Sequence, residues 1–384
     1  MQNLITIMYD LVATTNWGLE DICGEEVRRI TKYNIDVDVN KIFFRGNIED
    51  IYIINMTSRT IHKLIIVLYR GRFNDLNDIY KIAKNLSYVE YIKPDQSFAI
   101  RTVRTGSHDF TSIEAAAKIG KGVIDSYMMD TGVRLKVNLD RPDIEVLCLI
   151  RNEELIIGIN TTGDSLHRRG YRVYNHPAAL KSTIASAMLM YSKWRGEPVL
   201  DPMCGGGTII IEAALMARNI PILKFRRDYA FRKLKIHDEN LYKKISELVW
   251  SKVNYGYYEI YGFEISPKHI HGAYENLVSA DVNDTVKLFL RDAIKIDSYI
   301  DLDPKYIIVN PPYGLREKRT GYVEELYRKF LESISDIYSG LTLTLITAAK
   351  QKFLKTALEI GIKIIDVRHV MHGRLETAVF KCIL

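Results

Sequence analysis

The residues Asn310-Pro311-Pro312-Tyr313 directly follow an apolar run, 306–309, that is typical of a buried strand. Asn310 offers a side-chain carbonyl acceptor, and Pro311 offers a main-chain carbonyl with no N–H beside it. Two acceptors on the hydrogens of a conjugated exocyclic amine favour the pyramidal form that can attack a methyl group. Tyr313 supplies a ring on which a nucleobase can stack. The four residues therefore indicate methylation of a base amine, although Asn-Pro and Pro-Pro are also common loop formers.

A second signal lies upstream, where a short apolar strand ends at Asp201 and a glycine-rich turn leads into an apolar helix. Glycines allow close approach of a ligand, and the helix N-terminus presents free N–H groups. A P-loop would need a lysine here, and a dinucleotide fingerprint would need a glycine where Ile210 stands. An Asp-first glycine turn suits S-adenosylmethionine (SAM) best. The expected SAM contacts in this turn are Asp201, Met203, Cys204, Gly205, Gly206, Gly207 and Thr208.

Polar side chains also end the following strands. Glu264 follows an apolar run and can accept both ribose hydroxyls, and Asp292 is placed to accept the adenine amine. Since the carboxyl ends of parallel strands meet at one edge of a sheet, we expect these acids to lie beside Asp201 and Asn310. One acid at a strand end is more often a solvated loop residue, but an ordered series of four indicates a site. The expected contacts completing the SAM site are Glu264, Ile265, Asp292, Ala293 and Asn310.

Four motifs together resemble the Rossmann-fold RNA methyltransferases that carry a THUMP domain: GDSLHRRGYR (163–172), LDPMCGGGTIIIEAA (200–214), GFEIS (262–266) and NPPYG (310–314). Within that family the chain is most similar to the tRNA guanine-N2 methyltransferases that act at position 6 of the acceptor stem. The resemblance implies SAM-dependent methylation of N2 of a guanosine. The Asn-Pro-Pro-Tyr motif alone does not separate guanine N2 from adenine N6. An adenine-N6 methyltransferase of DNA or RNA, an rRNA guanine-N2 methyltransferase and a non-catalytic RNA-binding protein therefore stay open.

The fold that the resemblance implies is α/β, with a Rossmann-like seven-stranded methyltransferase domain preceded by α+β ferredoxin-like and THUMP domains. A length of 384 residues and 47% hydrophobic residues fit more than one core. We expect a ferredoxin-like domain at 1–50, a THUMP domain at 51–162, a linker at 163–183 and the methyltransferase domain at 184–384. The pattern predicts a short strand at 46–48 and a helix at 178–194. The resemblance implies a reversed last pair of strands in the second sheet.

The net charge of +6 and its distribution favour an RNA partner. Six basic and three aromatic residues alternate over 224–235, which is typical of a strip that contacts phosphates and bases. We expect this strip beside the active edge of the sheet. The THUMP resemblance implies binding of the tRNA 3′ end in addition to the acceptor stem. The candidate RNA contacts are Arg101, Arg104, Arg168, Arg169, Arg172, Arg226, Arg227 and Arg316.

The four cysteines are scattered and form no CxxC pair, which argues against a disulfide framework and against a metal site. This pattern favours a reducing compartment. Residues 1–6 lack a basic segment, and no apolar run is long enough for a membrane span, so a cytoplasmic protein is expected. The sequence does not determine the oligomeric state, and we expect a monomer. His176 and His372 are expected to be ordinary loop histidines, because amine methylation needs no base as strong as imidazole.

Overall fold

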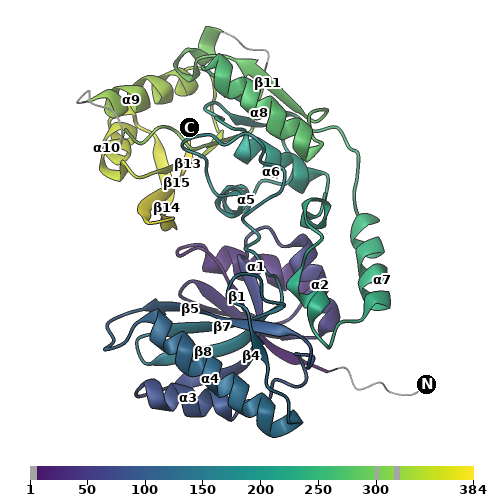
Figure 1. Ribbon diagram of the computed structural model, residues 1–384. Coiled ribbons are helices and arrows are strands. Elements are labelled where there is room, and N and C mark those ends of the chain that lie inside the picture. Colours follow the sequence, from purple (N-terminus) through teal and green to yellow (C-terminus); the bar gives the residue numbers. More distant parts are fainter. Residues whose placement is uncertain (1–6, 299–301, 315–320) are drawn as a thin grey trace. The chain divides into compact units, whose positions relative to one another are not determined.

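A computed structural model describes residues 7–298, 302–314 and 321–384. The chain forms two units that interleave along the sequence (Figure 1). Unit 1 comprises the described part of 1–14 together with 24–166 and 226–249. Unit 2 comprises the described parts of 15–23, 167–225 and 250–384. The predicted linker is therefore divided between them, with the break after Leu166.

Unit 1 is built on an eight-stranded sheet of order β2-β3-β1-β4-β8-β7-β5-β6. Its helices include α2 (Ile48–Thr57), α3 (Leu76–Lys84) and α4 (Ser112–Thr131), and most of α1 (Glu20–Thr31) also belongs to this unit. The strands are β1 (Tyr9–Thr14), β2 (Asp36–Asp38), β3 (Lys41–Gly46), β4 (Lys63–Arg72), β5 (Ser97–Thr105), β6 (Lys136–Val137), β7 (Ile144–Arg151) and β8 (Glu154–Asn160).

Strand β4 sits at the centre of this sheet because it pairs with both β1 and β8. It runs antiparallel to each, and its register with β8 extends from Ile65 opposite Asn160 to Arg72 opposite Glu154. The strands on either side of β4 therefore share one continuous hydrogen-bonded layer.

The predicted strand at 46–48 is wrong, because these residues mark the boundary between a strand and a helix. Gly46 ends β3, and Asn47 is the N-cap of α2. The Asn47 side chain accepts from the backbone N–H of Asp50 at 3.0 Å, and Asp50 accepts from the backbone N–H of Asn47 at 2.8 Å. This reciprocal capping box satisfies two amides that the first helical turn leaves without partners, so helix formation wins over the β-propensity of Ile48.

The segment 226–249 lies far along the sequence but folds with unit 1. It contains the 3₁₀ turn η2 (Ala230–Lys233) and most of α7 (Glu239–Trp250), while η1 (Ile222–Phe225) precedes it in unit 2. Phe231 packs against Tyr52 of α2 with ring centroids 4.7 Å apart. The hydroxyl of Tyr52 also lies 2.9 Å from Nδ1 of His237. These buried aromatic contacts fix the insertion to the N-terminal unit.

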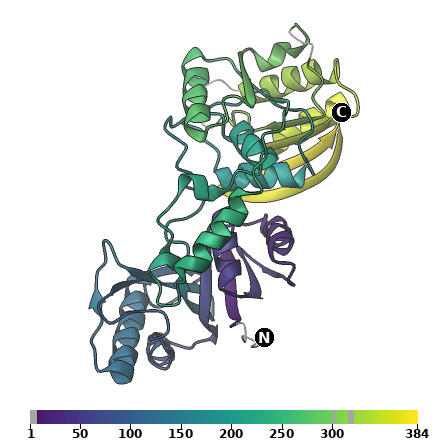
Figure 2. The same ribbon diagram turned by 90° about the vertical axis from the view of Figure 1, so that its right-hand side faces the viewer.

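Unit 2 contains a seven-stranded sheet of order β11-β10-β9-β12-β13-β15-β14. Its strands are β9 (Val199–Asp201), β10 (Ile260–Glu264), β11 (Val286–Leu290), β12 (Tyr306–Val309), β13 (Thr342–Thr347), β14 (Lys363–His372) and β15 (Leu375–Ile383). Strands β9 to β13 are parallel, and β15 lies between β13 and β14, antiparallel to both. Figure 2 shows these last strands, in yellow, as one curved layer. The predicted reversal of the last pair is present.

Helices cover both faces of this sheet and create two cores. The helices are α5 (Ser182–Tyr191), α6 (Thr208–Ala217), α8 (Pro267–Ala280), α9 (Tyr322–Ser335) and α10 (Lys350–Ile360), with the 3₁₀ segment η3 (Ala293–Ser298). Within β12, Ile308 packs with α5, α6 and α8, whereas Ile307 and Val309 pack with α9 and α10. This alternation is what a strand buried on both faces requires.

The predicted helix at 178–194 is shorter in the structure, since α5 begins only at Ser182. Residues 176–180 instead remain extended or in turns and line a cavity described below. Within the described ranges, no helix has both the length and the apolar character needed to cross a membrane. The same ranges hold no group of three or more His, Cys, Asp or Glu side chains arranged for a metal ion.

Candidate functional site

A cavity of about 680 Å³ lies at the carboxyl ends of the parallel strands of unit 2. It is lined by all four predicted strand-end residues, Asp201, Glu264, Asp292 and Asn310. Its volume falls within the range of small-molecule sites, roughly 300–1,000 Å³. The structure thus brings together side chains that are up to 109 positions apart in sequence, as the series of strand ends predicted.

The glycine turn between β9 and α6 has a backbone that only glycine adopts without strain. Gly205 has a φ of +53° and Gly207 a φ of +80°. A Cβ atom on Gly205 would also lie 3.2 Å from Cε1 of His176. The glycines therefore keep the cavity floor open.

Most amides of this turn are already paired inside the protein. Asp201 Oδ1 accepts from the backbone N–H of Met203 at 3.2 Å, and Glu264 Oε2 accepts from that of Gly205 at 3.1 Å. The backbone N–H of Cys204 donates to the carbonyl of Phe263 at 2.8 Å. The amides of Cys204 and Gly205 therefore hold the turn against β10, and the amide of Met203 ties it to the end of β9.

Asp201 is buried to 1% exposure at the end of β9. Burial, aided by the nearby charge of Glu264, raises the pKa of Asp201 to about 8, against the opposing hydrogen bond from Met203. Burial raises the pKa of the neighbouring Cys204 thiol well above its usual value. An acid in such surroundings is ready to ionise when a cation binds beside it.

This raised pKa predicts how the stability of the ligand-free protein depends on pH. The folded state keeps the Asp201 proton up to about pH 8, whereas the ordinary carboxyl value is 3.8. Between these values the folded state binds more protons, so the free energy of unfolding falls as the pH rises. We expect wild type to lose stability from about pH 5 to 8 more steeply than Asp201→Asn. Denaturant titrations at several pH values measure both slopes, and equal slopes would contradict the assignment.

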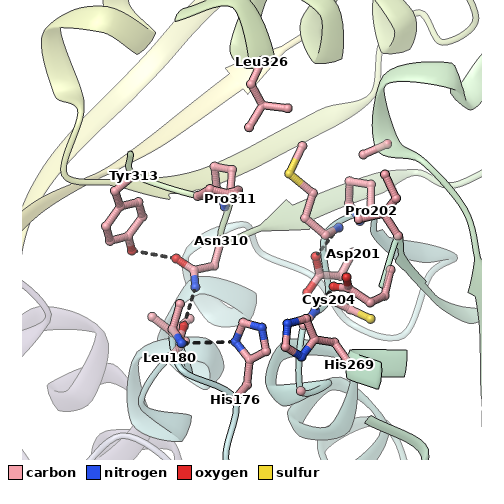
Figure 3. Close-up of a pocket in the computed structure, with 18 of the residues that line it drawn as sticks. His176, Leu180, Asp201, Pro202, Cys204, His269, Asn310, Pro311, Tyr313 and Leu326 are labelled. Carbon is pink, nitrogen blue, oxygen red and sulfur yellow. Dashed lines mark hydrogen bonds between the residues drawn. The ribbon is translucent and has the colours of Figure 1, made fainter. Parts of the chain in front are cut away.

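Asn310 is held by two hydrogen bonds at the other end of the cavity (Figure 3). Its Oδ1 accepts from the Tyr313 hydroxyl at 2.6 Å, and its Nδ2 donates to the Ala178 carbonyl at 3.4 Å. The Tyr327 hydroxyl donates to the Pro312 carbonyl at 3.1 Å. Tyr313 thus orients the amide in addition to offering a ring face. Burial raises the pKa of Tyr313, so its hydroxyl stays protonated and remains a donor at neutral pH.

The Pro311 carbonyl has no hydrogen-bond partner among the residues that the structure describes. Pro311 lines the cavity next to Asn310, and both residues follow the end of β12. The two residues that carry the predicted acceptors therefore line the same cavity.

The remaining predicted cofactor residues line the same cavity near β10 and β11. Asp292 accepts from the backbone N–H of Ile294 at 3.1 Å, and Ala293 is buried beside it. Ile265 is 65% exposed and presents an apolar surface at the cavity rim. Glu264 Oε1 accepts from the backbone N–H of Ser266 at 2.9 Å, so the carboxylate is fixed at both oxygens.

His176, expected to be an ordinary loop histidine, and His269, for which no role was predicted, both line the cavity. His176 and His269 make an edge-to-face pair with ring centroids 4.4 Å apart (Figure 3). His176 Nδ1 accepts from the backbone N–H of Ala178 at 3.2 Å, and His269 Nδ1 lies 2.6 Å from the Tyr174 hydroxyl. Burial and His269 lower the pKa of His176, which favours a neutral ring. His372 also lines the cavity and ends β14, so it is not in a loop as expected.

Several arginines predicted to bind RNA have structural roles instead. The predicted RNA contact of Arg169 is wrong, because its side chain is 1% exposed and its Nε donates to Glu212 Oε1 at 3.2 Å. The predicted RNA contact of Arg226 is also wrong, since its Nη2 donates to the Thr162 carbonyl at 3.0 Å and its side chain is mostly buried. Arg172 donates to the Leu180 carbonyl at 2.9 Å and to Thr208 Oγ1 at 3.1 Å, which ties the chain before α5 to the start of α6.

The other candidate arginines differ in how accessible they are. Arg101 donates to Glu145 at 3.1 Å and to the Leu139 carbonyl at 2.7 Å, and Arg104 lies 2.9 Å from His108. Arg168 and Arg227 are exposed. Arg316 lies outside the described residues. From Arg226 on, the basic strip belongs to unit 1, whereas the whole cavity lies in unit 2.

Comparison with protein families matches three models along the chain. The model described as "RMKL-like, methyltransferase domain" matches residues 169–378, the THUMP domain matches 73–160, and the RlmL ferredoxin-like domain matches 10–65. These matches confirm the predicted order of domains. The bounds set from the sequence, 1–50, 51–162, 163–183 and 184–384, stay predictions.

Similar proteins cover nearly the whole chain. A tRNA (guanine(6)-N2)-methyltransferase of Methanocaldococcus jannaschii is 41% identical over 97% of this chain and 99% of its own. One of Archaeoglobus fulgidus is 40% identical over 96% and 90%. A ribosomal RNA large subunit methyltransferase K/L of Methylococcus capsulatus is 29% identical over 97% of this chain and 50% of its own length.

Solved structures share the fold. SMU.472, described as a methyltransferase in complex with SAH, has a TM-score of 0.85 and 25% identity, with 97% of both chains covered. TrmN from Thermus thermophilus has a TM-score of 0.72 and 24% identity, covering 98% of this chain and 99% of its own.

Proposed function

Because the chain belongs to the RMKL-like methyltransferase family, we propose that it transfers a methyl group from SAM to N2 of guanosine 6 in tRNA. The observation that carries this proposal is that Asp201, Glu264 and Asp292 line the same cavity as Asn310 and Pro311. A donor and a base can therefore meet at one sheet edge.

The cavity fits SAM in size and in chemistry. Asp201 would hold the ammonium group, whose positive charge lowers the pKa of this acid and lets it ionise on binding. Glu264 would accept from the ribose through the lone pairs that its two amide partners leave. Asp292, Ile265 and Ala293 would contact the adenine ring and its amine. When bound, SAM supplies an electrophilic methyl group attached to a sulfonium centre.

The Asn-Pro-Pro-Tyr segment orients the amine of the target base. Asn310 Oδ1 and the Pro311 carbonyl would each accept one N2 hydrogen, which directs the nitrogen lone pair at the methyl group. Pro312 stiffens the loop, and its carbonyl is fixed by Tyr327. The new N–C bond forms as the S–C bond breaks, and the N2 proton then leaves to water. Correct positioning accounts for most of the acceleration, worth on the order of 7 kcal/mol or more.

The target base must leave its stem to reach this cavity. Guanosine 6 lies in the paired acceptor stem, so flipping it out costs a few kcal/mol. We propose that unit 1, which contains the THUMP match, holds the tRNA through its acceptor stem and 3′ end. Arg101, Arg104, Arg168 and Arg227 remain candidate contacts. We further propose a cytoplasmic monomer, and the four free cysteines, all buried, fit a reducing compartment.

The test uses unmodified tRNA transcripts with guanine or adenine at position 6. We expect the full-length protein and SAM to produce N2-methylguanosine at position 6 of the first transcript and nothing in the second, as mapped by nuclease digestion and mass spectrometry. Methylation of the adenine transcript would support the adenine-N6 alternative. Unmodified rRNA is assayed in parallel, and product on rRNA alone would support the rRNA alternative. Failure to bind SAM in calorimetry would indicate a non-catalytic RNA-binding protein.

A further inference from the structure

One face of α9 lines the cavity next to the Asn-Pro-Pro-Tyr segment. The residues of this face recur at helical spacing and are Tyr322, Glu325, Leu326 and Lys329. The opposite face, which includes Tyr327 and Phe330, is buried in the core. Leu326 points into the cavity from the side opposite His176 (Figure 3). Glu325 and Lys329 therefore belong to the same wall of the cavity as Leu326.

Glu325 and Lys329 form an ion pair at this wall. Lys329 Nζ donates to Glu325 Oε1 at 2.9 Å. The side chain of Lys329 is 52% exposed and that of Glu325 is 43% exposed. An exposed pair of this spacing adds only about 0.3–0.5 kcal/mol to stability. A second pair on α9, Glu324 with Lys355 at 2.8 Å, does not line the cavity. The pair of Glu325 and Lys329 by itself therefore contributes little to stability, and both of its side chains line the cavity.

The pair matches the hydrogen-bonding edge of guanine. A carboxylate accepts hydrogen bonds only, and an ammonium group donates them only. Guanine presents an N1–H donor beside its N2 amine and an acceptor at O6, whereas adenine presents an acceptor at N1. The carboxylate of Glu325 would accept from N1–H of guanine, but it would meet a lone pair in adenine. The ammonium of Lys329 would donate to O6.

We propose that Glu325 and Lys329 read the Watson–Crick edge of the flipped base and select guanine over adenine. This inference rests on the proposed function. It explains how guanine is distinguished from adenine, which Asn310 and Pro311 cannot do because they bind only an exocyclic amine. Enzymes that place hydrogen-bonding groups against a substrate reject analogues that lack the matching atoms, because the enzyme groups are then left without partners.

The test replaces guanine 6 by 2-aminopurine in ligated tRNA, with each base opposite the same uridine. 2-Aminopurine keeps the N2 amine but lacks N1–H and O6. We expect wild type to prefer guanine by about 10- to 100-fold in kcat/KM. Glu325→Ala should lower kcat/KM for the guanine tRNA toward the value for the 2-aminopurine tRNA. The same variant should leave kcat/KM for the 2-aminopurine tRNA within about threefold of wild type. This selective loss is expected if Glu325 interacts with the atoms that 2-aminopurine lacks. Glu325→Gln keeps one acceptor oxygen and should retain part of the preference.

Glu324→Ala is the matched control, since it removes the neighbouring glutamate that does not line the cavity and should leave the preference unchanged. Lys329→Met should lower the preference as Glu325→Ala does. Equal use of both tRNAs by wild type would overturn the inference while leaving the proposed function intact. An equal loss of kcat/KM on both tRNAs in Glu325→Ala would also overturn the inference, because it would indicate a structural role for Glu325. No methyl transfer by wild type to either tRNA would instead contradict the proposed function.

Discussion

Asn310→Ala is expected to lower kcat about 100- to 1,000-fold, the loss seen when one positioned polar group of a reaction centre is removed. Alanine leaves the amine with the Pro311 carbonyl as its one remaining acceptor, so the nitrogen is no longer directed at the methyl group. The affinity for SAM should stay within about threefold, because Asp201, Glu264 and the glycine turn are unchanged. Single-turnover methylation of tRNA and calorimetry with SAM measure the two quantities separately.

Tyr313→Phe provides the matched control for this prediction. It keeps the aromatic ring for stacking but removes the hydroxyl that donates to Asn310 Oδ1 at 2.6 Å. The amide then loses one of its two hydrogen bonds, and we expect a loss in kcat of about tenfold, which is the value of one ordinary hydrogen bond. Turnover in Asn310→Ala close to that of wild type would refute the role of Asn310.

Glu212→Ala is expected to destabilise unit 2 by about 3–5 kcal/mol, because it leaves a buried guanidinium without its carboxylate. Glu212 on α6 is fully buried, and its oxygens accept from Arg169, from the Tyr171 hydroxyl at 2.9 Å and from Ser186 Oγ at 2.6 Å. All three tryptophans, Trp17, Trp194 and Trp250, belong to unit 2. Tryptophan fluorescence in denaturant therefore reports the unfolding of this unit.

Two further variants separate the buried pair from its surroundings. Arg168→Ala removes the exposed neighbour of Arg169 and should change the free energy of unfolding by less than about 0.5 kcal/mol. The double variant Arg169→Met with Glu212→Leu removes both charges and should be less destabilised than Glu212→Ala. A wild-type unfolding midpoint in Glu212→Ala would show that the network contributes nothing.

The sequence predicted which residues gather at the cavity better than it predicted the contacts of charged residues. Asp201 and Glu264 were found because they end strands, and Asn310 and Asp292 because they lie one and two residues beyond a strand, and strand order is visible in the hydrophobic pattern. Arg169 was misassigned because nothing local marks its partner, which lies 43 positions away on α6. An arginine in a polar, glycine-containing segment looks solvated until the fold buries it.

The contact of His176 with His269 and the α9 face of the cavity were not predicted, for a related reason. His176 and His269 are 93 positions apart in the sequence, and they meet only because the chain before α5 lies over the glycine turn. Asn276 of α8 holds that chain in place by accepting from the backbone N–H groups of Val173 and Tyr174 at 2.9 and 2.8 Å. No periodicity reports such a contact between a loop and a helix.

The central position of β4 has a practical consequence for protein engineering. A protein cut between residues 65 and 73 would expose two long unpaired strand edges, and such edges promote aggregation. The first seventy residues and the THUMP segment should therefore be expressed, exchanged or transplanted only as one block. A chimera that swaps the THUMP segment alone would have to recreate a seven-position antiparallel ladder with a foreign partner.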